Sequence, residues 1–281
     1  PFAQRSNPPA NTFTNLTGSD VNTIHANNFK FYEELDEVIQ REPSEMFSPE
    51  LLGMASAIGI QKGKPFNPTR EQKALLTEAV AIGNATARSI LFAPQDPKAY
   101  IYPGKAGYWQ TGFPGGNHTY LVDGGNGGRD MDGRTLFFYL ATVNTPAMVL
   151  ELPGVGSQYA FSSRDGSGAY LDGSKTYKVN IPANPPAQRF WSFVVYDPQT
   201  RSMLQSKEMP YPSKNNKRNP EMAKNADGSI DLYFGPEAPA GKEANWVKTV
   251  PGKGWFGIFR LYGPGQEWFD RTWKLGAIEQ L

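Results

Sequence analysis

The first third of the chain carries apolar residues at helical spacing. Between Asp20 and Ile39 the apolar side chains recur at this spacing, which predicts a first helix with Asp20 as its N-cap. A second, shorter helix is predicted over residues 49–59, where a proline stands at the first helical position and a glycine ends the pattern. Residues 67–92 predict a third helix with an apolar stripe. These helices need a surface to pack against, and the region that follows them is the simplest one.

From Tyr100 onward the pattern changes to short apolar segments that are separated by Gly, Pro and Asp-Gly turns. Regular spacing of such segments is typical of an antiparallel sandwich or jelly roll. We therefore predict an α+β protein, in which an extended arm and helical subdomain at 1–98 precedes an antiparallel β-sandwich or jelly-roll domain at 99–281. The predicted strands are 99–102, 136–143, 147–152, 157–163, 176–181, 190–196, 202–206, 230–234 and 255–262.

Two of these segments carry more information than the rest. In FWSFVVYD at 190–197, both alternating faces are largely apolar, so this strand is expected to lie in the centre of a sheet and to be buried on both sides. In the last predicted strand, Arg260 alternates with aromatic and aliphatic residues. Because a charge within a sheet needs a partner, we expect Arg260 to pair with Asp197 or Asp231.

Composition narrows the class of protein. The 281 residues include 29 Gly, 24 Pro and 13% aromatic residues, which favours turns and short strands. The formal net charge of +1 argues against a nucleic-acid partner, and the short basic segment at 214–218 is interpreted as a solvated loop. No cysteine is present, which excludes disulfides and thiolate chemistry. No apolar stretch approaches the roughly 18 residues of a membrane span.

The C-terminal motifs resemble a large, mainly bacterial family that pairs two domains of unknown function, numbered 1254 and 1214. The motifs that carry the resemblance are DGSGAYLDGSKTYKV at 165–179, PPAQRFWSFVVYD at 185–197, NADGSIDLYFGP at 225–236, GKEANWVKTVPGKGWF at 241–256 and WFDRTWK at 268–274. They place a 1214-type domain at about 165–274, and the helical region resembles the connector that precedes it. The resemblance implies a β-sandwich or jelly-roll core and a 1254-type domain upstream of this chain. It brings no catalytic residues. With the absence of cysteine, it leads us to expect a periplasmic or extracellular bacterial protein.

Candidate chemistry lies in the Gly-rich segment GGNHTYLVDGGNGGRD. If this segment is extended, His118 and Tyr120 point the same way, and Arg129 follows them. His, Tyr and Arg are the residue types that remove a proton beside a carboxylate and protonate a leaving oxygen, as polyuronate lyases do. The alternative is a surface loop that contains one histidine by chance. The other histidine, His25, is predicted to lie in the first helix with a packing role.

Aromatic residues offer a possible binding surface for sugars. Trp109, Trp246 and Trp268 lie near predicted loops, so we expect them to be exposed and to bind ligand. The acidic turns at Asp165 and Asp227 are better explained by turn geometry than by calcium, and no metal is predicted. No cofactor is predicted either, because the chain lacks a P-loop, a dinucleotide-binding fingerprint and a nucleophile elbow.

The leading functional hypothesis is a secreted carbohydrate-active enzyme of the polyuronate eliminase type, with His118, Tyr120 and Arg129 as its catalytic residues. The first alternative is a non-catalytic module that binds a ligand or takes part in assembly, and the second is a hydrolase of small esters or amides. The expected partners are an acidic polysaccharide or a small-molecule ligand, and either a second copy of the chain or an N-terminal domain.

Overall fold

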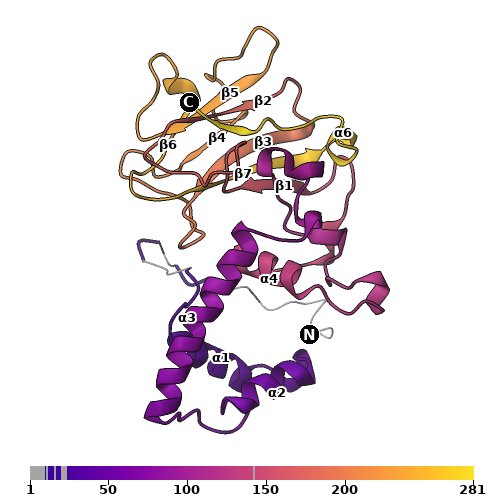
Figure 1. Cartoon of the computed structure of the whole chain (residues 1–281), viewed down its shortest axis with the longest axis vertical. Coiled ribbons are helices and arrows are strands. Elements are labelled where there is room, and N and C mark those ends of the chain that lie inside the picture. The colour runs from indigo at the N-terminus through magenta and orange to yellow at the C-terminus, as the bar shows by residue number, and fades with distance from the viewer. Residues whose placement is uncertain (1–9, 11, 16, 20–23, 142) are drawn as a thin grey trace.

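The N-terminal part of the chain folds as helices below a β-sandwich in the computed structural model (Figure 1). The structure describes all residues except 1–9, 11, 16, 20–23 and 142. The helices are α1 (Lys30–Arg41), α2 (Pro49–Ala57), α3 (Arg70–Phe92), α4 (Met131–Leu140), α5 (Pro146–Val149) and α6 (Gln266–Phe269). Short 3-10 turns lie at Ser44–Met46, Pro97–Ala99, Pro103–Tyr108, Pro114–Gly116, Asp123–Gly125 and Glu243–Asn245.

Helix α3 connects the two parts of the molecule (Figure 1). It begins with a capping box, in which the Thr69 hydroxyl accepts from the Gln72 amide at 3.2 Å and the Gln72 side chain accepts from the Thr69 amide at 2.9 Å. Toward its start, Leu76 and Val80 pack on a small core of α1 and α2 residues. At its end, Leu91 packs against the sandwich. Helix α3 therefore fixes the helical region to the β-region.

The predicted helices are largely confirmed. Helix α2 has Pro49 at its first position, and the predicted third helix matches α3. The first helix is present as α1, but the expected N-cap Asp20 lies outside the described residues. His25 precedes α1 instead of lying within it, so that part of the prediction is wrong.

The sandwich consists of two four-stranded sheets. The first sheet has the order β1-β7-β3-β4, formed by Ser157–Ser162, Phe256–Pro264, Ala187–Tyr196 and Ser213–Asn215. The second sheet has the order β6-β5-β2-β8, formed by Trp246–Lys248, Ile230–Gly235, Tyr177–Ile181 and Ile278–Gln280. All neighbouring strands are antiparallel except β5 and β6, which are parallel. The predicted α+β fold with a β-sandwich is confirmed.

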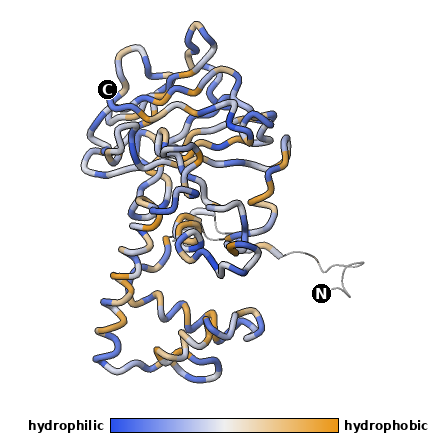
Figure 2. Tube along the Cα trace, turned by 45° about the vertical axis from the view of Figure 1, so that its right-hand side comes forward, coloured by the Kyte–Doolittle hydropathy of each residue, from blue (hydrophilic) through white to orange (hydrophobic). Residues whose placement is uncertain are grey.

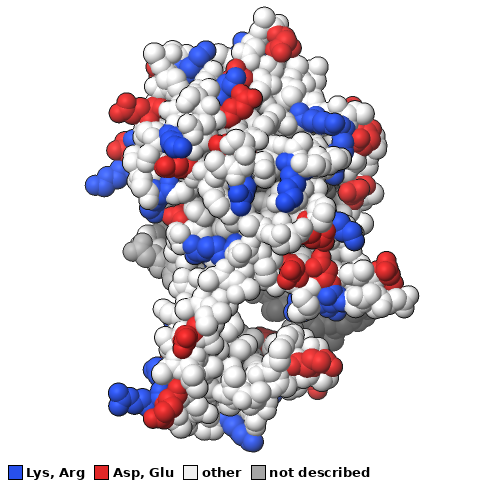
Figure 3. All heavy atoms as spheres, in the orientation of Figure 1, with Lys and Arg blue, Asp and Glu red and all other residues white. Residues whose placement is uncertain are grey.

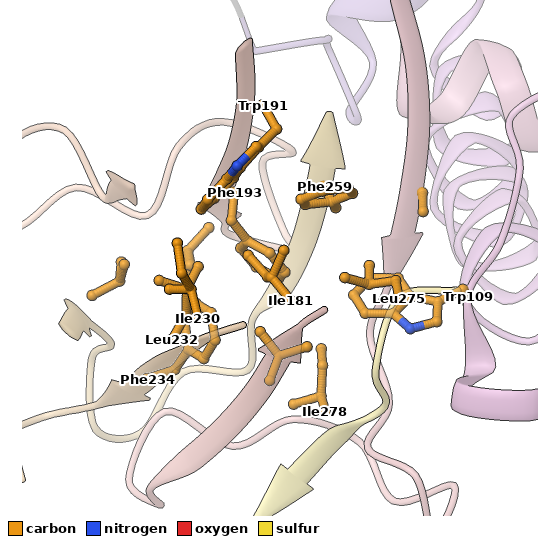
Figure 4. Close-up of a cluster of buried hydrophobic side chains, with 14 of the residues drawn as sticks. Trp109, Ile181, Trp191, Phe193, Ile230, Leu232, Phe234, Phe259, Leu275 and Ile278 are labelled. Atoms are coloured by element: carbon orange, nitrogen blue, oxygen red, sulfur yellow. The ribbon is translucent and has the colours of Figure 1, made fainter. Parts of the chain in front are cut away.

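The main core fills the space between the two sheets (Figure 4). Phe193 on β3 and Phe259 on β7 point inward from the first sheet, and Leu232 and Phe234 on β5 meet them from the second. In Figure 2 hydrophobic residues recur along the strands and also along the helical region. As predicted, β3 is buried on both sides between Trp191 and Val195.

The helical region covers only part of the outer face of the first sheet. Phe161, Phe256 and Ile258 on that face form a second core with Leu91 and Leu136 from α3 and α4. In the described part of the chain, no helix joins a hydrophobic cluster over the rows of the sheet beyond Ile258, and these rows carry polar and aromatic side chains. This uncovered half of the face holds the site described below.

Several predicted strands are wrong. Of the predicted strands 136–143 and 147–152, residues 136–140 lie in α4 and residues 147–149 lie in α5, and 99–102 and 202–206 contribute only isolated bridges. A short apolar run does not distinguish a strand from a buried helix. Here the Asp130 side chain caps α4 by accepting from the Gly133 amide at 2.7 Å, and α4 packs along α3. Strands β4, β6 and β8 have three residues each, too few for alternation to be read. The division at residue 98 stays a prediction.

Candidate functional site

A row of side chains crosses the uncovered half of the first sheet from one edge to the other. In the sheet register, Arg260 on β7 lies opposite Tyr159 on β1 and, on its other side, opposite Ser192 on β3. Ser192 in turn lies opposite Asn215 on β4. Since side chains alternate along a strand, these four lie on the face opposite the core residue Phe259. The sheet register therefore brings together residues that are far apart in the sequence.

Arg260 lies in the middle of this row and has no acidic partner among the residues that the structure describes. Its guanidinium lies 5.5 Å from the ring centre of Tyr159 and 5.8 Å from that of Tyr196. One Nη donates to the Tyr196 hydroxyl, and the buried Nε has no hydrogen-bond partner. None of the ion pairs in the described part of the chain includes Arg260.

The expected pairing of Arg260 with Asp197 or Asp231 is wrong. Asp197 accepts from the Lys253 ammonium at 2.8 Å, and Asp231 accepts from the Asn180 amide at 2.8 Å. Both carboxylates are thus held by groups on other strands or loops. Arg260 is left as a half-buried cation that neutral hydroxyls and aromatic rings surround, an arrangement that favours binding of an anion.

A cavity of about 570 Å³ is lined by three members of the row, Arg260, Ser192 and Asn215. The stacked rings of Phe190 and Tyr262 line it, with their centres 4.1 Å apart and their planes 15° apart. Lys217 and Arg218 also line it, from the turn after β4. Their backbone amides donate to the Asn215 side chain at 3.1 and 2.7 Å, which fixes this turn. The described lining includes three cations and no carboxylate.

The ionisation of the site suits donation of hydrogen bonds. Burial raises the pKa of Tyr196, although the neighbouring Arg260 cation opposes this shift. Burial works against the charge of Arg260, but Tyr196 and the other tyrosines outweigh it, and the pKa of Arg260 is raised. Near neutral pH the site therefore presents a protonated tyrosine and a charged guanidinium.

The residues predicted from the Gly-rich segment have a different environment. The segment is not extended, because Tyr120 has a φ of 56°. The condition under which His118 and Tyr120 were expected to point the same way is therefore not met. Tyr120 is buried beside the rings of Phe113 and Phe137, and burial raises its pKa. The exposed Arg129 donates to the Thr119 carbonyl. The catalytic role of His118, Tyr120 and Arg129 stays a prediction.

The three tryptophans also differ from expectation. Trp109 and Trp268 are 0% and 2% exposed, so their predicted exposure is wrong. Trp109 lies in the main core and donates to the Gly276 carbonyl at 3.0 Å, while Trp268 packs beside Trp273. Trp246 is partly exposed, with its indole N–H donating to the Gly235 carbonyl at 3.0 Å. A ligand role for Trp246 stays a prediction.

The acidic turns are used for local geometry, as predicted. The Asp165 side chain accepts from the amides of Ser167 and Ala169, and the Asp227 side chain accepts from the amide of Ser229. Within the described ranges, no three His, Cys, Asp or Glu side chains gather as metal ligands. None of the helices that the structure describes is both long and apolar enough to cross a membrane.

The sequence contained part of the signal for this site. Alternation in the sequence predicts that Arg260 lies on a sheet face. Only the folded structure shows that Arg260 has no carboxylate partner among the described residues. The segment that contributes Lys217 and Arg218 was interpreted only as a solvated loop. Tyr159 and Asn215 were missed, since nothing in the sequence shows that β1 and β4 belong to the same sheet as β7.

Comparisons with known proteins find a family match within the β-region and leave its activity open. Two solved structures are similar. The VPA0106 protein from Vibrio parahaemolyticus is 19% identical with a TM-score of 0.43, and the match covers 98% of this chain and 58% of that one. A putative uncharacterized protein from Burkholderia cenocepacia is 16% identical with a TM-score of 0.36, and the match covers 83% of this chain and 48% of that one. The chain thus spans about half of the length of these proteins. No curated protein matches it. Residues 156–266 match the family described as "Protein of unknown function (DUF1214)", and this match overlaps the 1214-type region expected at about 165–274.

Proposed function

We propose that this protein binds an acidic carbohydrate over the uncovered half of the first sheet, with Arg260 holding a carboxylate of the ligand. The observation that carries the proposal is the half-buried Arg260 guanidinium, which has no carboxylate partner in the described chain and a free buried Nε. A charge in such a place costs free energy unless something compensates it. An anionic ligand supplies this compensation, and Lys217 and Arg218 at the cavity add attraction of the same sign.

Aromatic rings and hydroxyls favour a sugar acid over a simple anion. The stacked pair of Phe190 and Tyr262 offers a flat apolar surface beside the guanidinium, as a sugar ring requires. Ser192 and Asn215 supply polar groups for sugar hydroxyls. An acidic polysaccharide as ligand is consistent with a periplasmic or extracellular location, which we include in the proposal.

Elimination of a uronate is the second candidate function. Arg260 beside the Tyr196 hydroxyl supplies a group that neutralises a carboxylate and a group that protonates a leaving oxygen. The reaction also needs a base. Because the pKa of Tyr196 is raised and the described cavity lining contains no histidine, binding takes precedence over catalysis.

The proposal is tested by calorimetric titration of the protein with oligogalacturonate and with a neutral oligosaccharide of equal length. We expect binding of the acidic ligand only, with affinity that falls as salt rises. Arg260→Gln removes a charged hydrogen bond of about 1.5–3 kcal/mol, so affinity falls about 10- to 100-fold. Arg70→Gln, an equal change of charge at the exposed start of α3, leaves binding unchanged.

Equal affinity of Arg260→Gln and the wild type refutes the proposal, as does equal binding of the neutral ligand. Ultraviolet absorbance of the same mixtures separates the two candidate functions, since elimination creates a new carbon–carbon double bond. A rise in absorbance that Arg260→Gln abolishes establishes elimination at this site. A rise that only His118→Ala abolishes moves the chemistry to the Gly-rich loop.

A further inference from the structure

A cavity of about 680 Å³ lies between α3 and the β-sandwich. One side is a stripe of α3 that includes Asn84, Arg88 and Phe92, each four residues from the next and therefore on one face of the helix. The other side is formed by Tyr170 from the loop after β1 and by Trp255 at the start of β7. Cavities of this size between two parts of a protein are typical of small-molecule sites.

Among the described residues, the cavity has a positive charge without a counter-ion. The Arg88 guanidinium donates to the Gln199 side chain, and no ion pair among the described residues includes it. Next to the cavity, Arg164 stacks 3.9 Å from the ring centre of Tyr170 and donates to its hydroxyl at 2.7 Å. No Asp or Glu appears in the described lining. The charge pattern therefore favours an anionic ligand.

The aromatic part of the lining is fixed in place. Trp255 stacks on Phe234 with ring centres 5.0 Å apart and meets Tyr177 edge to face at 5.7 Å, so it is held by the main core. Phe92 is held in the same way by Phe256, at 5.6 Å. Rigid aromatic walls select a flat ligand, because a flat ligand makes the larger contact.

Two polar atoms in residues that line the cavity lack partners. The Ser163 hydroxyl and the Trp255 indole N–H are both buried, and neither has a hydrogen-bond partner in the structure. Native proteins leave few buried polar groups in this state, since each one costs free energy. Such groups occur where stability is given up for binding.

We propose that this cavity is a second binding site, for a small planar carboxylic acid whose carboxylate pairs with Arg88 and whose ring lies between Phe92 and Trp255. The site shares no lining residue with the cavity at Arg260, and it takes a compact ligand instead of a carbohydrate chain. The two proposals are therefore independent.

The test uses the full chain and para-fluorobenzoate, whose binding is followed by fluorine NMR line broadening and by displacement with benzoate. The neutral amide para-fluorobenzamide is the matched probe without the charge. We expect the acid to bind and the amide to bind at least about tenfold more weakly, because only the acid pairs with the guanidinium.

Three variants locate the binding. Arg88→Gln weakens binding of the acid at least about tenfold, whereas Arg70→Gln on the same helix leaves it unchanged. Arg260→Gln also leaves it unchanged, which separates this site from the carbohydrate site. The proposal is overturned if the acid does not bind, if the amide binds equally well, or if Arg88→Gln keeps the wild-type affinity.

Discussion

Two neighbouring serines at the end of β1 are expected to respond to substitution by alanine with opposite changes in the free energy of unfolding. Ser162 and Ser163 are both buried, at 0% and 4% exposure. The Ser162 hydroxyl donates to the Arg164 carbonyl at 2.9 Å and accepts from the Arg164 amide at 3.2 Å. The Ser163 hydroxyl has no hydrogen-bond partner among the described residues. The two positions therefore differ mainly in whether the hydroxyl is hydrogen-bonded.

The magnitudes follow from the cost of an unpaired polar group. Ser163→Ala removes a buried hydroxyl that costs about 1–3 kcal/mol while unsatisfied, so the free energy of unfolding is expected to rise by about 1 kcal/mol. At about 2–4 °C per kcal/mol, this corresponds to a small rise in Tm. Ser162→Ala removes two hydrogen bonds and leaves two backbone groups of Arg164 without them, so the free energy of unfolding falls by about 1–3 kcal/mol.

Urea denaturation followed by tryptophan fluorescence is the suitable assay. All six tryptophans lie at or beyond position 109, so the signal reports on the β-region and on the segment packed against it. The slope of the transition must stay equal among the proteins for the midpoints to be compared. If Ser163→Ala destabilises as much as Ser162→Ala, the Ser163 hydroxyl has a partner, and our interpretation of the unpaired group is wrong.

Two further substitutions test the packing and the charge network of the sandwich. In Gly257→Ala the new Cβ lies 2.5 Å from two ring atoms of the buried Phe193, so we expect a loss of about 1–3 kcal/mol in urea denaturation, whereas Gly53→Ala within α2 has open space and stabilises. A wild-type midpoint in Gly257→Ala contradicts this. Burial raises the pKa of Asp197. The hydrogen bond from Lys253 and the other favourable interactions of the carboxylate outweigh this effect of burial and hold the pKa below its ordinary 3.8. This stabilisation is present above pH 3.8 and is lost as pH falls through the lowered pKa, so Asp197→Asn is less stable at pH 7 and the difference narrows in acid. A difference that does not change with pH refutes this assignment.

The sequence predicts best where a single element carries enough information by itself. Helix α3 begins after Thr69, which forms a capping box with Gln72 in the first turn, and the helix continues over 23 residues. Local signals therefore define it. Strand β3 is largely apolar and is buried on both faces between Trp191 and Val195, and a central strand accommodates that pattern. The alternation that contains Arg260 is also local, which is why its place on a sheet face was predictable.

The tertiary structure decided what depends on contact between distant segments. The segment at 136–140 is apolar enough for a strand or a helix, and packing on α3 makes it helical. The exposure of Trp109 depends on whether distant segments cover its side chain. In the structure, Trp109 is buried in the main core between the two sheets. Figure 3 shows charges of both signs spread over the visible face of the sandwich.

By itself, the sequence determined an α+β chain with helices first and a sandwich after them, because helix periodicity, strand alternation and turn residues act over a few neighbouring positions. It did not determine either candidate site. The Arg260 site exists because the sheet register aligns four strands, and because the two carboxylates expected as partners of Arg260 are engaged elsewhere. The cavity at Arg88 exists because one face of α3 packs across three loops of the sandwich. Both depend on partners that are distant in the sequence, and only the folded chain defines them.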